Sequence, residues 1–186
     1  MSDDDLRWML GARTEGGDYK IFRTHFRDAP HPRTGAMKRF SLIEATDWVN
    51  IIAITDDEHV VLIRQYRPGV DRICLEIPGG MVDPGEDAQT AAARELVEET
   101  GYTATRWQKI GAIAPNPAIQ NNTLHTFVAT NARRTSEPHD HTSYDGNELI
   151  EIETAPLAEC YAMVRDGRID HALVVAAFGH LALRSR

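Results

Sequence analysis

One stretch of the chain, residues 80–102, constrains the fold more strongly than any other, because a turn-rich loop leads there into a helix crowded with carboxylates. Asp87 stands where an N-cap is expected, an apolar stripe follows it, and Gly101 is a natural C-terminal stop. These signals predict a helix over residues 88–99. The carboxylates that this helix carries need a compensating positive charge.

Three glutamates lie on one side of the predicted helix. Glu95 and Glu99 are four residues apart, and Glu95 and Glu98 are three apart, so their side chains gather along the helix. Like charges at these spacings destabilise an isolated helix by about 0.2–0.5 kcal/mol per pair, which indicates a counter-ion beside them and beside Glu86. All-oxygen ligation favours Mg²⁺ or Mn²⁺ over zinc. Arg94, four residues before Glu98, can pair with it and orient the carboxylates.

Length and charge limit the class of protein. The 186 residues suffice for one domain with a substantial core, and the net charge of -8 argues against a nucleic-acid-binding protein. Cys74 and Cys160 lack a paired spacing, which favours buried thiols over a disulfide or zinc site. The acidic N-terminus resembles no signal peptide, and the longest apolar stretch, 172–183, is too short to span a bilayer. We therefore expect a cytoplasmic protein with no membrane partner.

Strand and helix signals on both sides of this helix predict the architecture. Residues 131–147 are polar and predict a long loop. Strands are predicted at 19–26, 38–44, 48–54, 60–63, 75–77, 107–113, 124–128 and 149–152, and further helices at 157–166 and after Asp170. This order predicts an α/β/α sandwich with a mixed sheet rather than a doubly wound parallel sheet. We expect residues 1–45 to form an N-terminal antiparallel strand region and residues 46–186 to form the main domain.

The spacing of the fixed residues in this stretch carries a family resemblance. Glu98 and Glu99 alone would be typical of a solvated helix face. The full pattern resembles the Nudix box, Gly-x5-Glu-x7-Arg-Glu-U-x-Glu-Glu-x-Gly-U, with Leu96 and Tyr102 at the bulky apolar positions U. A chance match at one starting position has a probability on the order of 10⁻⁹. The resemblance implies the sandwich fold and a hydrolase in which metal ions assist water attack on phosphorus. It assigns metal ligation to Glu95, Glu98, Glu99, Glu86 and the Gly79 carbonyl, and catalytic roles to Glu98 and Arg94.

Stretches outside the box resemble the branch that hydrolyses ADP-ribose and related nucleoside diphosphate sugars. Residues 62–67 are similar to that branch's strand ending in Glu-Gln-Tyr-Arg, which implies that Arg67 contacts substrate phosphate. Residues 75–80 are similar to its Glu-x-Pro-Ala-Gly segment, which implies that Glu76 helps to hold the nucleoside side. Pro117, sixteen residues after Gly101, and residues 166–172 also resemble this branch.

The chain departs from this branch directly after Pro117. The branch usually has an acidic stretch there, whereas this chain has Ile119-Gln120-Asn121-Asn122. An amide can hydrogen-bond a sugar but is a poor metal ligand beside carboxylates, so Gln120 is predicted to bind substrate. The departure leaves another sugar nucleotide, such as GDP-mannose, as an open alternative.

The base that activates water is expected on a loop after the box. Residues 144–150 resemble the branch's Glu-Asn-Glu-x-Ile run, and Glu148 matches its second acid, whereas Gly146 stands at the first. The resemblance therefore implies that Glu148 is the general base. Asp145 and Glu98 remain alternatives for this role.

Together these features predict a metal-dependent pyrophosphohydrolase that uses Mg²⁺ or Mn²⁺ to cleave ADP-ribose to AMP and ribose 5-phosphate. The alternatives are another nucleoside diphosphate sugar, a dinucleotide or a nucleoside triphosphate as substrate. A hypothesis from another class is a ligand sensor that binds ADP-ribose without turnover, against which the intact box carboxylates argue. The resemblance also implies a homodimer, with residues 1–45 as the dimerisation segment.

Overall fold

The computed structural model describes residues 2–135 and 149–184. The chain divides into two compact units. The first, which we call the strand unit, comprises Met1–Thr46 and Ala114–Thr123; the second, the sandwich unit, comprises Asp47–Ile113 and Leu124–Arg186. The two units are described separately below.

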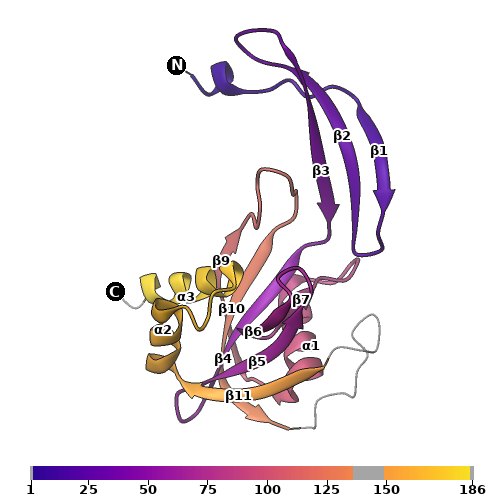
Figure 1. Ribbon diagram of the computed structural model, residues 1–186. Helices are drawn as coiled ribbons and strands as arrows, with labels where there is room; N and C mark the ends of the chain where they lie inside the picture. The colour runs from indigo at the N-terminus through magenta and orange to yellow at the C-terminus, as the bar shows by residue number, and fades with distance from the viewer. Residues whose placement is uncertain (1, 136–148, 185–186) are drawn as a thin grey trace. The chain divides into compact units, whose positions relative to one another are not determined.

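The strand unit is built on a three-stranded antiparallel sheet (Figure 1). A short 3-10 helix, η1 (Asp3–Leu6), precedes the strands β1 (Arg13–Asp18), β2 (Phe22–Pro30) and β3 (Met37–Ala45), which lie in that order. The strands predicted at 19–26 and 38–44 are confirmed as β2 and β3, except that residues 19–21 form a turn in which Lys20 has a φ of 68°. Strand β1 was not predicted, because its two glycines and charged residues give no apolar alternation and its order comes from pairing with β2.

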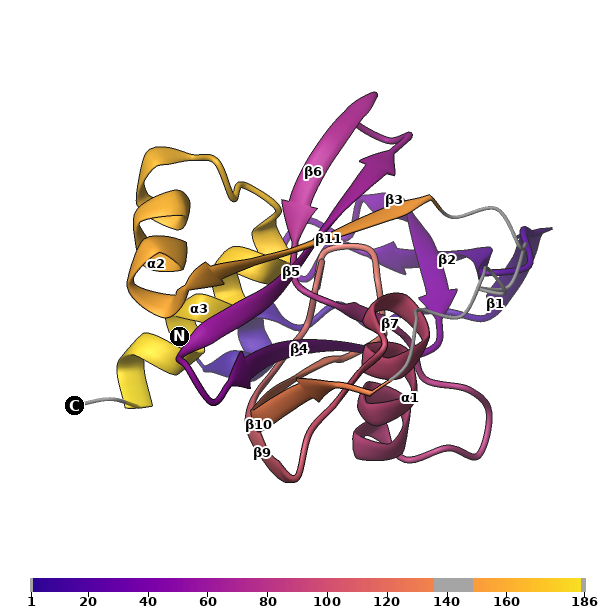
Figure 2. The ribbon, with the colours of Figure 1, turned by 90° about the horizontal axis from the view of Figure 1, so that it is seen from below.

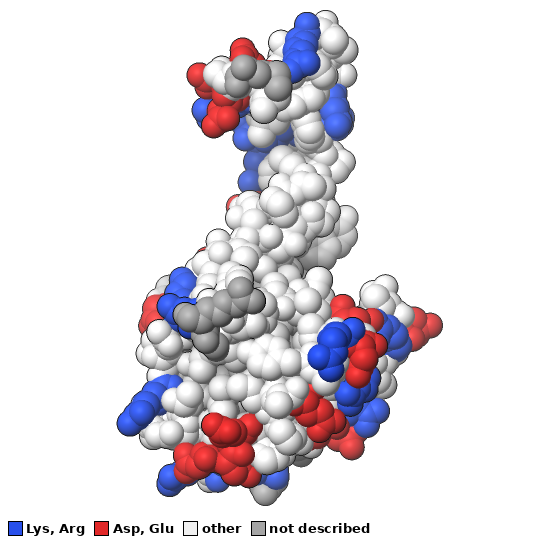
Figure 3. All heavy atoms as spheres, turned by 90° about the vertical axis from the view of Figure 1, so that its left-hand side faces the viewer, with Lys and Arg blue, Asp and Glu red and all other residues white. Residues whose placement is uncertain are grey.

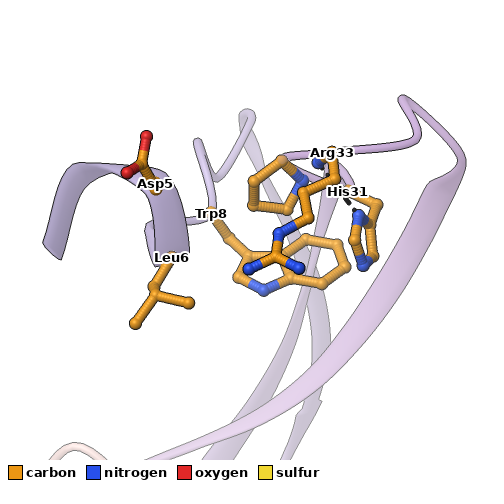
Figure 4. A pocket seen from close by; sticks show the side chains of 6 residues that line it. Asp5, Leu6, Trp8, His31 and Arg33 are labelled. Atoms are coloured by element: carbon orange, nitrogen blue, oxygen red, sulfur yellow. Dashed lines mark hydrogen bonds between the residues drawn. The ribbon is translucent and has the colours of Figure 1, made fainter. Parts of the chain in front are cut away.

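Trp8 packs beside His31 and the turn between β2 and β3 at one end of this unit (Figure 4). The Trp8 ring meets the rings of His31 and Phe40 edge-on, with centroid distances of 5.1 and 5.0 Å. His31 Nδ1 accepts hydrogen bonds from the backbone N–H groups of Arg33 and Thr34. A hollow of about 180 Å³ lies beside this cluster.

The sandwich unit holds a mixed eight-stranded sheet between helices (Figures 1 and 2). Its strands are β4 (Trp48–Thr55), β5 (His59–Arg67), β6 (Arg72–Glu76), β7 (Gly79–Met81), β8 (Tyr102–Thr103), β9 (Arg106–Ile113), β10 (Leu124–Arg134) and β11 (Ile150–Pro156). Strands β4 and β10 are parallel, and the other pairings are antiparallel. Helix α1 (Ala88–Thr100) covers one face, and helices α2 (Leu157–Asp166) and α3 (Ala172–Arg184) cover the other. The predicted α/β/α sandwich is confirmed.

Strand β4 shows why the sheet needs helices on both faces. Its successive side chains point to opposite faces. Val49 and Ile51 pack with Leu96 of α1, whereas Ile52 packs with Phe178 of α3. Both sets are buried, so this apolar run is a strand covered on both sides.

The prediction of a loop over residues 131–147 is wrong for its first residues, 131–134, which belong to strand β10. Strand β10 continues to Arg134, and its last two residues, Arg133 and Arg134, pair with strand β8. Asn131 has a φ of 57°, and the register of β10 on β4 shifts between Thr130 and Ala132. This bulge interrupts the alternation that would have revealed the strand. Residues 136–148 lie outside the described part of the chain.

The charged surface of the sandwich unit is mixed on the side of α2 and α3. Figure 3 shows Lys and Arg side chains there beside Asp and Glu side chains, without a continuous basic patch on this face. Arg168, for example, pairs with Glu159 and Asp166. Among the described residues, no helix is both long and apolar enough to cross a membrane.

Candidate active site

Helix α1 is placed by local signals at its two ends. The Asp87 side chain accepts hydrogen bonds from the backbone N–H groups of Gln89 and Thr90 at 3.0 and 3.1 Å. Gly101 adopts the left-handed conformation with a φ of 70° and donates its N–H to the Val97 carbonyl. The predicted N-cap and C-terminal stop are therefore confirmed, with the helix one residue longer than predicted. Its buried face packs on the sheet through Ala91, Ala92 and Leu96, which leaves the glutamates on the other side.

Arg94 lies at the centre of the box carboxylates. Its guanidinium donates to both oxygens of Glu86 at 3.0 and 3.2 Å, to Glu95 at 2.9 Å and to Glu98 at 3.0 Å. It also donates to the carbonyl of Met81 at 3.0 Å. The hydrogen bond to Glu86 is the main reason that the pKa of Arg94 is raised, and the same bond lowers the pKa of Glu86. The predicted pairing of Arg94 with Glu98 is confirmed, and Glu86 and Glu95 join it.

The pKa of Glu95 is shifted in the opposite direction from the pKa of Glu86. Burial raises the pKa of its carboxyl, and Arg94 partly offsets the shift. Its side chain is 14% exposed and lies against Gly80, a position where no side chain intervenes. A buried carboxylate with a raised pKa lacks sufficient positive charge in its surroundings.

Glu99 lies on the neighbouring turn of α1 and reaches the strand that leads into the box loop. Its Oε2 accepts the backbone N–H of Gly79 at 2.9 Å. Gly79 is paired with Asn50 of β4, so the sheet holds this donor in place. The structure thus brings together Gly79 and Glu99, two of the predicted metal-site residues.

The donor set fits a hard divalent cation. Glu86, Glu95, Glu98 and Glu99 present carboxylate oxygens, and Arg94 bonds three of the four. Oxygen ligands of this kind suit Mg²⁺ or Mn²⁺. Within residues 2–135 and 149–184, no three Asp, Glu, His or Cys side chains already surround one ligand position, and three of the four carboxylates bond Arg94 instead. A divalent cation held by these carboxylates would supply an activated water and would neutralise charge on a pyrophosphate.

The structure also joins two residues that the sequence assigned to substrate binding. Arg67 donates through Nε and Nη2 to the two carboxylate oxygens of Glu76 at 2.7 and 2.9 Å. The Glu76 side chain is 3% exposed and that of Arg67 is 38% exposed. Gln120 belongs to the strand unit, where it forms an isolated bridge with Ile43. Glu148 and Asp145 lie outside the described residues.

Two features of the site were missed from the sequence. The Met81 carbonyl, which accepts from Arg94, is a backbone group, so its residue type carries no signal. Gln65 of β5 is 4% exposed and its Oε1 is buried without a hydrogen-bond partner. The alternation of β5 could have placed Gln65 on the same face as Arg67, since the two are two residues apart.

Comparisons with known proteins identify the family of the chain. The chain is 28% identical over 165 residues to an ADP-ribose pyrophosphatase of Bacillus subtilis, covering 89% of this chain and 87% of that protein. It is 27% identical to a methanol dehydrogenase activator of Bacillus methanolicus, with the same coverage. A crystal structure of an ADP compounds hydrolase shares the fold, with a TM-score of 0.79 at 23% identity over 95% of this chain and 92% of that one. The family model for the NUDIX domain matches residues 46–178, so the chain belongs to the Nudix hydrolase family.

Proposed function

We propose that this Nudix hydrolase is a metal-dependent pyrophosphatase that cleaves ADP-ribose to AMP and ribose 5-phosphate, with Mg²⁺ or Mn²⁺ as the cofactor. The observation that carries the proposal is the arrangement of Glu86, Glu95 and Glu98 around the single guanidinium of Arg94. One arginine cannot balance three carboxylates and the nearby Glu99. A site with this excess of negative charge attracts a divalent cation, and the bound cation in turn attracts a pyrophosphate.

The choice of ADP-ribose is supported by the name of the Bacillus subtilis relative and by Arg67. A guanidinium is suited to bidentate recognition of phosphate. The amide side chain of Gln120 favours GDP-mannose or another nucleoside diphosphate sugar as the second candidate, because an amide can hydrogen-bond sugar hydroxyls. The neighbouring Asn121 and Asn122 side chains already hydrogen-bond the backbone of Ala45 and Thr46. In either case Gln120 is proposed to contact the sugar.

The proposed general base is Glu148, with Asp145 and Glu98 as alternatives. A carboxylate whose oxygens are engaged with a metal ion or with Arg94 is poorly placed to accept a proton from water. Glu98 already bonds Arg94, which favours a base from outside the box.

A turnover screen with the purified protein tests the proposed function. Substrates are ADP-ribose, GDP-mannose, UDP-glucose, NADH, diadenosine polyphosphates and nucleoside triphosphates, each with Mg²⁺ and with Mn²⁺. We expect the highest kcat/KM for ADP-ribose, and no turnover in chelator. Binding of ADP-ribose without turnover of any substrate would instead favour a sensor or an activator of another enzyme. Full activity in chelator would exclude the metal assignment.

We also propose that the chain forms a homodimer through its strand unit. Ala29 is the one buried apolar residue among the described residues of this unit, whereas Leu6, Met9, Tyr19, Ile21 and Met37 are exposed. A three-stranded sheet with so little buried apolar surface is only marginally stable alone. The mass in solution at micromolar concentration tests the proposal: a monomer that retains activity would contradict it.

A further inference from the structure

The ion pair between Arg67 and Glu76 joins an almost fully buried carboxylate to a partly exposed guanidinium. Nε and Nη2 of Arg67 donate to the two oxygens of the same carboxylate, and this carboxylate is almost completely shielded from solvent. A bidentate pair fixes the plane of the guanidinium as well as its position. Burying Glu76 without this partner would be strongly unfavourable, so the two side chains are obligate neighbours in the fold.

The register of the β5–β6 hairpin shows that Arg67 turns back along the sheet to make this pair. Arg67 lies opposite Arg72, whereas Glu76 lies opposite Ile63, four residues earlier on β5. Like charges directly opposite each other in a ladder repel, and Arg72 is itself paired with Asp170. The Arg67 side chain therefore extends away from the hairpin end and past Gln65 to reach Glu76.

Strand alternation decides on which face of the sheet Arg67 lies. By strand alternation Arg67 lies on the same face of β5 as Val61, which packs in the cluster formed with α1. Glu76 ends β6, and Gly79, which donates its N–H to Glu99, follows three residues later. The carboxylate that holds Arg67 is thus anchored in the same short segment that contacts the box glutamates.

We propose that Glu76 is a positioning residue that holds the Arg67 guanidinium where it meets the diphosphate of the substrate, and that it does not itself contact the nucleoside. This inference rests on the proposed function, in which Arg67 binds substrate phosphate. A guanidinium has five N–H donors, so one group can bond a carboxylate and a phosphate together. Glu76 contributes by reducing the freedom that Arg67 would otherwise lose on binding.

Glu76→Gln is the first test, because it keeps the shape of the side chain while replacing one acceptor oxygen by a donor that opposes the guanidinium. We expect KM to rise at least about tenfold with kcat changed less than about threefold, the pattern of lost ground-state binding. The dissociation constant of ADP, measured by calorimetry, should rise by the same factor. Glu151→Gln is the matched control, because Glu151 pairs with Arg64, which lies on β5 like Arg67, but the Glu151 side chain is 71% exposed. This control should change neither KM nor the dissociation constant of ADP by more than about twofold.

A double-mutant cycle with Arg67→Met separates positioning from direct contact and from a general structural role. If Glu76 acts through Arg67, Glu76→Gln has no further effect on KM or ADP affinity once Arg67 is replaced. Effects that multiply in the double variant would overturn the proposal. Should Glu76→Gln fail to fold, Glu76→Asp keeps the buried charge but shortens the tether, and it should raise KM in the same way.

The outcomes also distinguish this inference from the proposed function. Multiplicative effects in an enzyme that hydrolyses ADP-ribose would overturn the positioning role alone. A protein that turns over none of the screened substrates would refute the proposed function, and the ADP calorimetry would still show whether Arg67 and Glu76 act as one unit in binding a diphosphate. An ADP affinity unchanged by both single substitutions would overturn the inference in that case.

Discussion

Gly80 and Glu95 approach each other so closely that a Cβ atom on Gly80 would overlap Oε1 of the Glu95 carboxylate. The Glu95 carboxylate occupies the position that a Cβ atom on Gly80 would take. We therefore expect that the candidate active site requires a residue without a side chain at position 80.

Gly80→Ala should disable the site while leaving the fold nearly intact. The atoms that the new methyl group meets are the far end of a flexible side chain, so Glu95 can rotate away from Arg94. We expect Mg²⁺ affinity to fall at least about tenfold and the melting temperature to change by less than about 4 °C. The matched variant is Gly79→Ala, whose methyl group would overlap the backbone carbonyl oxygen of Val49. The backbone of β4 cannot rotate away as the Glu95 side chain can, so Gly79→Ala should lower the melting temperature by more than about 6 °C.

Glu95→Gln should stabilise the metal-free protein at neutral and alkaline pH. Because burial raises the pKa of Glu95 in the fold, the folded state binds this proton more tightly than the unfolded chain. The metal-free fold therefore loses stability as the pH rises through that raised pKa, and the neutral amide avoids this loss. In chelator at pH 8 we expect a melting temperature about 2–4 °C above that of the unsubstituted protein. The difference should disappear toward about pH 4, where the carboxyl becomes protonated in both states. A destabilised variant at pH 8 would contradict the charge imbalance.

Glu99→Gln should lose most of the catalytic rate and remain folded. The amide oxygen of the new side chain can still accept the Gly79 N–H, so the link between α1 and β7 persists. What is lost is one negative charge from the metal site. Mg²⁺ affinity measured by calorimetry should fall at least about tenfold, with circular dichroism unchanged. A fully active Glu99→Gln enzyme would show that Glu99 is not a metal ligand.

Glu148→Gln should lower kcat at least about a hundredfold with little change in KM. A general base must be ionised to accept a proton, so the rate falls as the pH drops through its pKa, and the substitution should remove this acidic limb of the pH–rate profile. A loss of less than about fivefold would mean that the base lies elsewhere. Asp145→Asn is then the next variant to measure.

The sequence predicted those parts of the fold whose signals are local. Helix α1 begins after Asp87 and ends at Gly101, because an N-cap side chain and a residue with positive φ act within one helical turn. The apolar runs at residues 48–54 and 60–63 likewise predicted the strands β4 and β5. By contrast, β1 and the last residues of β10 are polar and are held in strand conformation by pairing with β2 and β8. Their sequences contain no local pattern that predicts a strand.

For the active site, the sequence by itself determined the residue types and the helical spacing that gathers Glu95, Glu98 and Arg94. It could not determine how the loop and the sheet complete the site. Only the tertiary structure brings Glu86 onto Arg94 and the Gly79 amide onto Glu99, because these contacts cross from the loop or strand to the helix. The same holds for Arg67 and Glu76, which the sequence assigned to two separate contacts with substrate. The register of the β5–β6 hairpin and the burial of one carboxylate make them a single ion pair.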